Sequence, residues 1–127
     1  MHFPIAKTIP AADSRYHWDD NLMMANNNSS GYNYRKIAGS SNLSYHAQGL
    51  AVDINTFLNP YIYVADDGSV VTDPPGATYD PLAPGTLTKN HPLVRYMKDH
   101  GWTWGGDWTL ETDEVIDYQH FEKPNAL

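Results

Sequence analysis

The sequence predicts a small α+β protein, with a mostly antiparallel sheet and two or three helices. Two observations indicate this class. Some segments space their apolar residues as a helix does, whereas other short segments alternate apolar and polar residues as a strand does. The predicted elements follow in the order helix, strands, helix, strands. The chain has 127 residues, of which 41% are hydrophobic and 18% are charged. Such values are ordinary for a globular protein, and the length predicts one domain, residues 1–127, that buries a core without cross-links.

The first half of the chain is expected to hold one helix and two strands. Residues 13–25 fit a short helix with Asp13 or Ser14 as its cap, and a polar, Asn-rich turn follows. Residues 33–38 fit a short strand. Residues 50–55 fit a more regular strand, because apolar side chains alternate along it.

The second half is expected to hold a hairpin, a second helix and a final strand. Residues 61–72 fit the hairpin, with an Asp-Asp-Gly turn between its arms. The helix begins at a cap formed by Asn90 or His91, has a proline in its first turn, and ends at Gly101. Residues 118–122 fit the last strand.

Composition excludes several classes of function. There are no cysteines, so disulfides and thiolate chemistry are excluded and any metal is held by His, Asp or Glu. The net charge is -7 and no stripe of Lys and Arg is present, so we expect no nucleic-acid partner. No apolar run reaches the length of a membrane span, and no signal peptide is visible. We expect a monomer.

Two separated segments, residues 44–55 and 117–122, carry the side chains of a hydrolytic metal site. His46, Asp53 and His120 are the candidate ligands, because two imidazoles and one carboxylate hold Zn²⁺ and leave one coordination position for water. His46 and Asp53 would face opposite sides of a regular strand, since their separation is odd. A turn at the glycine between them is therefore needed to bring both to one metal.

Asp117 is the candidate general base. Its separation from His120 is odd, so we expect it on the turn before the last strand, where it reaches the water but leaves the metal open. A turn-forming role is the alternative. The nearby Glu111, Asp113 and Glu114 offer another base, although a solvated loop accounts for them more simply.

These residues resemble the signature of the LAS metallopeptidases, a group named after lysostaphin, D-alanyl-D-alanine peptidases and sonic hedgehog. The resemblance is carried by Ser44, His46, Gly49, Ala51, Asp53, Asp117 and His120, and is supported by Asn33-Tyr34-Arg35, Asn59-Pro60-Tyr61 and residues 104–108. It covers roughly residues 26–122. The closer match is the D-alanyl-D-alanine carboxypeptidase branch, which includes phage endolysins that cut the L-alanyl-D-glutamate bond, and it implies a hedgehog-like or D-Ala-D-Ala-peptidase-like fold.

The resemblance also implies roles for the individual residues. Zn²⁺ would be bound by His46, Asp53 and His120, and Asp117 would be the catalytic base. Arg35 would polarise the scissile carbonyl and stabilise the oxyanion, because a guanidinium is always charged and donates two parallel hydrogen bonds. Arg35 and Ser44 would contact the substrate. The structural alternative for Arg35 is a surface residue of a strand, and the alternative for Ser44 is a hydroxyl that stabilises a turn.

The function expected is hydrolysis of peptidoglycan stem peptides by a zinc peptidase, with the L-alanyl-D-glutamate bond as first choice. Aspartate at position 117 favours this bond, since the related D,D-dipeptidases carry glutamate there. The alternatives are a D-alanyl-D-alanine carboxypeptidase using the same groups, a non-catalytic metal-binding module, and a non-haem iron oxygenase. The spacing of His46 and Asp53 is unlike that of the oxygenases. The substrate implies action in the cell envelope or outside the cell, by an excised domain or a phage-delivered protein.

Overall fold

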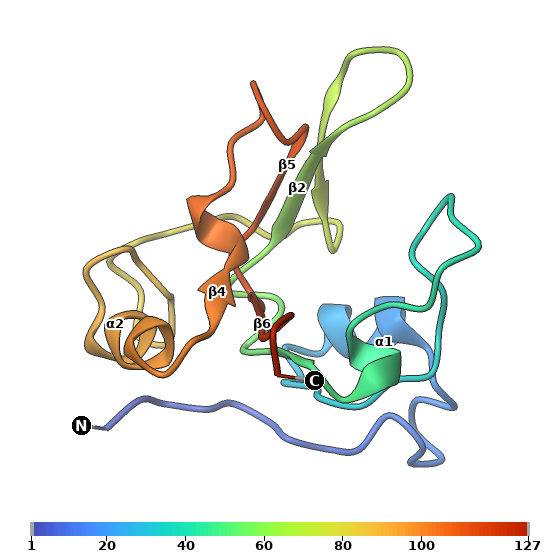
Figure 1. The fold of residues 1–127 in the computed structure, drawn as a ribbon, viewed down its shortest axis with the longest axis horizontal. Helices are drawn as coiled ribbons and strands as arrows, with labels where there is room; N and C mark the ends of the chain where they lie inside the picture. The colour runs from blue at the N-terminus through green and yellow to red at the C-terminus, as the bar shows by residue number, and fades with distance from the viewer. Residues whose placement is uncertain (1, 127) are drawn as a thin grey trace.

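The computed structural model describes residues 2–126, and within them the chain forms two three-stranded antiparallel sheets and two α-helices (Figure 1). The first sheet has the order β1-β6-β4, with β1 (Ala51–Asp53), β6 (His120–Glu122) and β4 (Thr103–Trp104). The second has the order β3-β2-β5, with β2 (Tyr61–Val64), β3 (Val70–Asp73) and β5 (Val115–Asp117). The α+β class is confirmed, with its strands divided between two sheets.

The two sheets are joined by the tight connection between β5 and β6. Asp117 ends β5, where it pairs with Tyr61 in the second sheet, and His120 begins β6, where it pairs with Asp53 in the first. Figure 1 shows β5 running from the β2 hairpin down into β6. Only the turn at Tyr118 and Gln119 separates them, so the side chains at this junction lie where the sheets meet.

The first helix is shorter than predicted. Helix α1 spans Asp20–Ala25, and Asp19 rather than Asp13 or Ser14 caps it, accepting a hydrogen bond from the Leu22 amide. The prediction for the preceding residues was wrong because His17 and Trp18 have φ values of 46° and 66°. Left-handed backbone at two consecutive positions cannot continue a right-handed helix.

The remaining predictions of secondary structure are largely confirmed. The hairpin forms as β2 and β3, and α2 (Pro92–Asp99) begins at His91, whose Nδ1 accepts a hydrogen bond from the Leu93 amide. The strand expected at residues 33–38 is not formed: this extended segment makes one isolated bridge, between Lys36 and Leu43. Neither helix within residues 2–126 is long and apolar enough to span a membrane.

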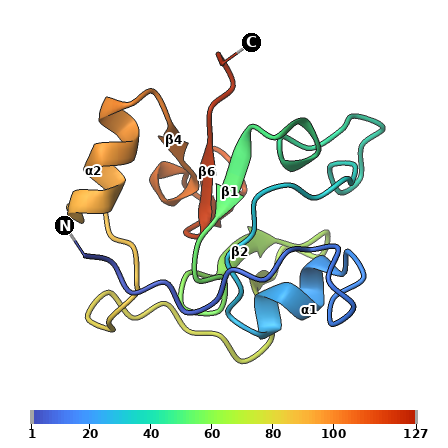
Figure 2. The ribbon, with the colours of Figure 1, turned by 90° about the horizontal axis from the view of Figure 1, so that it is seen from below.

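A compact apolar cluster fixes the first sheet. It consists of Leu87, Val94 of α2, Trp104 of β4 and Phe121 of β6, all buried. Figure 2 shows β6 between β1 and β4, with α2 beyond β4. Because Phe121 is fully enclosed in this cluster, its neighbour His120 is held on the opposite face of β6.

Buried asparagines replace apolar packing beneath β1. Asn55 and Asn59 have no exposed surface. Both donate to the Gly85 carbonyl, at 3.1 and 3.0 Å, and Asn59 Oδ1 accepts from the Leu87 amide. Asn55 also donates to the Pro4 carbonyl at 2.8 Å. Buried polar groups are stable only when paired in this way, so the hydrogen bonds lock the loops on which β1 rests.

Candidate metal centre

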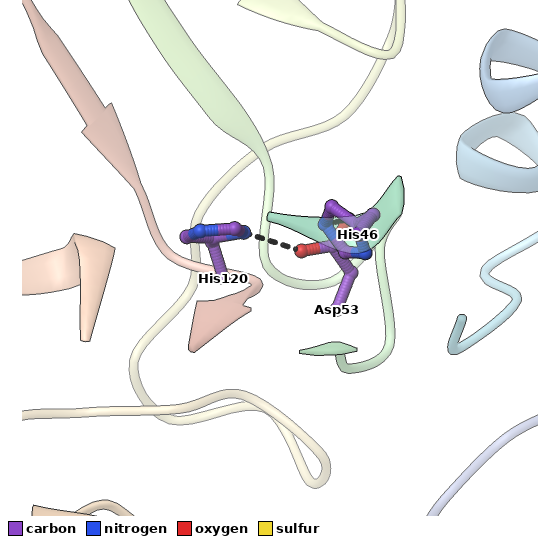
Figure 3. A group of neighbouring side chains, drawn as sticks. All are labelled: His46, Asp53 and His120. Atoms are coloured by element: carbon purple, nitrogen blue, oxygen red, sulfur yellow. Dashed lines mark hydrogen bonds and ion pairs between the residues drawn. The ribbon is translucent and has the colours of Figure 1, made fainter. Parts of the chain in front are cut away.

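Three side chains converge at the junction of the sheets (Figure 3). His46 lies on the 3₁₀ helix η1 (His46–Gln48), Asp53 ends β1 and His120 begins β6. One donor atom of each lies within 4.8 Å of the others. The expected turn is present at Gly49, whose φ of 71° brings the chain from η1 back into β1. Exposed fractions of 2%, 5% and 9% place all three away from bulk water.

The His46 ring is oriented by a backbone carbonyl. Its Nδ1 donates a hydrogen bond of 2.7 Å to the Gly31 oxygen, which can only accept. This bond directs Nε2 toward Asp53, where it lies 3.1 Å from Oδ2. Nε2 is buried and makes no hydrogen bond of good geometry within residues 2–126. A buried imidazole nitrogen without such a partner is suited to bind a metal ion.

The His120 ring is held from both sides. Its Nδ1 lies 3.0 Å from Asp53 Oδ1, and its Nε2 lies 2.9 Å from Glu122 Oε2. Glu122 was assigned no role from the sequence. The sequence did contain a sign of this role: Glu122 follows His120 by two residues on one strand, and residues i and i+2 of a strand share a face. Since Glu122 binds the far side of the ring, it orients a candidate ligand instead of adding a fourth donor.

This donor set fits zinc. In both rings one nitrogen faces Asp53, and the other is engaged by a carbonyl or carboxylate oxygen. Metal-binding histidines typically have this outer hydrogen bond, which fixes the ring orientation. Tetrahedral zinc with bonds of about 2.0–2.1 Å places its ligand atoms about 3.3 Å apart. Each histidine nitrogen lies near that distance from an oxygen of Asp53, at 3.1 Å from Oδ2 for His46 and 3.0 Å from Oδ1 for His120, and one ligand atom from each residue lies within 4.8 Å of the others.

Without a metal, the three groups form a charged cluster. Burial favours the protonated form of Asp53, but His46 and His120 outweigh it and lower the pKa of this carboxyl. Burial likewise favours neutral imidazoles, yet Asp53 raises the pKa of His46, and hydrogen bonds to Asp53 and Glu122 raise the pKa of His120 to about 10. A metal must therefore displace protons from both rings.

Asp117 lies at the end of β5, and the expectation of a turn position was wrong. The Tyr118-Gln119 turn follows Asp117 instead. The odd separation of Asp117 and His120 has no bearing on which way they face, because the two belong to strands of different sheets. Asp117 Oδ1 is buried, with no hydrogen-bond partner among residues 2–126. Burial first, then repulsion by Asp53, raises the pKa of Asp117 to about 8.

The backbone of Asp117 rests directly on a glycine. A Cβ atom added to Gly105 would lie 2.5 Å from the Asp117 carbonyl oxygen and 2.8 Å from the Asp117 Cβ. No other residue type fits at this distance without a shift of the strand. Gly105 therefore sets how deeply Asp117 enters the site.

All the predicted site residues line one cleft of about 440 Å³. They are Arg35, Ser44, His46, Asp53, Asp117 and His120. Side chains that were not predicted as site residues also line it, including Asp20, Tyr61, Asp73, Gln119 and Glu122. Glu111, Asp113 and Glu114 are exposed on the loop before β5 and do not line the cleft, which agrees with a solvated loop.

Arg35 and Ser44 occupy the cleft wall in different ways. Arg35 Nη2 lies 3.2 Å from Asp20 Oδ2, and its Nε is buried without a hydrogen-bond partner among the described residues. Ser44 Oγ accepts a hydrogen bond of 3.2 Å from the Ala47 amide and so supports the turn that carries His46. The turn role of Ser44 is thus present, while contact of either residue with substrate stays a prediction.

A His/Asp/His cluster beside a buried carboxylate in a cleft is the donor set of a metal site with an open coordination position, as in zinc hydrolases. A family model described as D-alanyl-D-alanine carboxypeptidase matches residues 38–123, and the chain belongs to this family of zinc peptidases. The match confirms the resemblance drawn from the sequence and covers His46, Asp53, Asp117 and His120. No match was found among curated proteins or solved structures.

Proposed function

We propose that the protein is a zinc-dependent endopeptidase that hydrolyses peptidoglycan stem peptides at the L-alanyl-D-glutamate bond. The observation that carries the proposal is the convergence of His46, Asp53 and His120 in a cleft that also holds the unpartnered carboxylate of Asp117. The substrate implies that the protein acts in the cell envelope or outside the cell.

This geometry supports the following roles for the side chains. His46, Asp53 and His120 would hold zinc, which supplies Lewis acidity and lowers the pKa of water to about 7. Asp117 removes a proton from the attacking water and delivers it to the leaving amine. In the metal-free protein burial raises the pKa of Asp117 to about 8, and the positive charge of a bound zinc would lower this pKa and favour the ionised carboxylate that accepts the proton.

Arg35, which lines the cleft, would bind the oxygen of the scissile carbonyl. One nitrogen is engaged by Asp20, and the other N–H groups remain to donate to an oxygen that gains negative charge. Because the guanidinium is always charged, this stabilisation does not depend on pH. Ser44 lines the same wall and holds the turn of His46 in place.

Two observations favour the endopeptidase over a carboxypeptidase with the same site. The base is aspartate, as in the endolysin-type relatives named above. In addition, the cleft-lining residues supply a single cationic side chain besides the histidines, Arg35, which already pairs with Asp20. A carboxypeptidase needs a receptor for the free C-terminal carboxylate. The D-alanyl-D-alanine carboxypeptidase stays the second candidate, because the family description names it.

Digestion of purified peptidoglycan followed by mass spectrometry tests the proposal. New N-terminal D-glutamate is expected from wild type and not from Asp117→Ala. The matched control is Asp113→Ala, which removes an exposed carboxylate outside the cleft and should retain activity. Loss of single terminal D-alanines would establish the carboxypeptidase instead. Absence of products from wild type and Asp117→Ala alike would favour a binding module, and stoichiometric iron without zinc would overturn the metal assignment.

A further inference from the structure

Asp20 is a wall residue of the cleft that the mechanism above does not use. It opens the first turn of α1, outside residues 38–123 that match the family. Its Oδ2 lies 3.2 Å from Arg35 Nη2, and both side chains are about one-third exposed. Burial raises the pKa of Asp20 although Arg35 opposes this shift, and Asp20 lines the same cleft as Asp53 and Asp117. Asp20 is therefore close to the reacting centre.

The charge of the cleft makes this pair important. Five carboxylates line the cleft, from Asp20, Asp53, Asp73, Asp117 and Glu122. Arg35 is the one Lys or Arg side chain among the described residues that line it. Asp20 neutralises that single positive charge. A zinc ion would offset two of the negative charges, so the lining would still repel an additional carboxylate on the substrate.

The hydrogen-bonding groups of Asp20 and Arg35 likewise disfavour a carboxylate on the substrate. Arg35 can only donate and the carboxylate of Asp20 can only accept. A group that both accepts and donates, such as a primary carboxamide, is satisfied by the two side chains together. A free carboxylate accepts from Arg35 but meets the negative oxygens of Asp20 without a proton to share.

We propose that Asp20 is a specificity-determining residue that, through Arg35, makes the cleft prefer stem peptides whose glutamate α-carboxyl is amidated. This inference rests on the proposed function, since the α-carboxyl group belongs to the residue that follows the cleaved bond. It assigns a role in substrate choice to α1, which lies outside the matched region.

The test uses two peptides that differ only at this group. They are L-alanyl-γ-D-glutamyl-L-lysine with a free α-carboxylate, and the same peptide with an α-carboxamide. The ratio of kcat/KM for amide over acid is measured with zinc-loaded wild type, Asp20→Asn and Asp19→Asn. Asp19→Asn is the matched control: it removes the same charge one residue earlier, does not touch the cleft, and asparagine keeps the helix cap.

Wild type is expected to prefer the amide, and Asp20→Asn to lower the amide-to-acid ratio about fivefold, as for a partly exposed ion pair. Asp19→Asn should leave the ratio unchanged. In an Arg35→Gln background, Asp20→Asn should no longer alter the ratio. A wild-type preference for the acid, an unchanged ratio in Asp20→Asn, or an effect that persists without Arg35 would overturn the inference.

The same ratio is measured for binding, by calorimetry with zinc-loaded Asp117→Ala protein with and without Asp20→Asn. This measurement distinguishes failure of the proposed endopeptidase activity from failure of the inference about Asp20. Cleavage of neither peptide by wild type would contradict the proposed endopeptidase, whereas the binding ratio alone still decides whether Asp20 selects the amide.

Discussion

The zinc affinity of this site is expected to fall on acidification from a higher pH than that of a site built of ordinary histidines. Asp53 lies 3.0 Å from His120 and 3.1 Å from His46, and its charge favours the protonated form of both rings. Protons and zinc therefore compete for the same nitrogens. Glu122 strengthens the competition at His120, because it also accepts from the charged ring.

The magnitude follows from the number of protons released. Below about pH 6.5 both rings are protonated without metal, so binding releases two protons and affinity changes about a hundredfold per pH unit. Between pH 7 and 9 an ordinary imidazole is already neutral. His120, with its pKa raised to about 10, still releases a proton there, which corresponds to at least about tenfold per pH unit because the pKa of His46 is raised as well.

Zinc affinity is measured against a competing chelator from pH 6 to 9, in the Asp117→Ala protein so that this carboxyl adds no proton. Glu122→Gln in the same background is the control, because it lowers the pKa of His120 and should flatten the slope above pH 7. Nitrogen chemical shifts of the metal-free protein report the His120 ring directly. The explanation is refuted if that ring loses its proton near pH 6.5, or if Glu122→Gln leaves the slope unaltered.

Three further predictions concern stability and the supports of the site. The raised pKa values of His120 and Asp117 add stability at low pH that is lost as pH rises through about 8 and 10, so the unfolding free energy of metal-free protein, measured with urea, should fall by several kcal/mol from pH 6 to 10; a rise would contradict this sign. Gly105→Ala should lower kcat and cost about 1–3 kcal/mol in thermal unfolding, because the new Cβ meets the Asp117 backbone. Gly31→Ala, whose Cβ has room, should change stability by less than about 0.5 kcal/mol. Glu122→Ala should weaken zinc binding to the neutral His120 ring about 10–100-fold while preserving the fold, once the measured proton release is taken into account, and an unchanged affinity of the neutral ring would show that His120 needs no outer partner.

The turn between His46 and Asp53 was predictable because local rules determine it, whereas their grouping with His120 through the β1–β6 pairing was expected from the family resemblance. Gly49 marked the turn that reorients the chain between His46 and Asp53, and the alternation of residues 50–55 directed Asp53 to one face. The position of Asp117 was not predictable in the same way. A two-residue turn takes the chain from one sheet to another there, and no local pattern distinguishes that turn from a continuous strand.

Features that depend on tertiary contacts were missed. The early start predicted for α1 followed capping preferences, whereas His17 and Trp18 adopt left-handed backbone. The pairing of Asp20 with Arg35 joins two segments with no shared periodicity, so the sequence carried no signal for it. The fold class needed only the order of elements, and this explains why it was predictable when such details were not.

The β5–β6 junction separates the candidate metal ligands from the proposed general base, Asp117. The candidate ligands are anchored in the first sheet and η1, whereas Asp117 belongs to the sheet of the protruding β2–β3 hairpin. Substitutions in that hairpin reach the proton-accepting group without passing through the metal ligands. Evolution or protein engineering could therefore reposition the proposed base from one arm of the molecule without replacing a candidate cation ligand on the other.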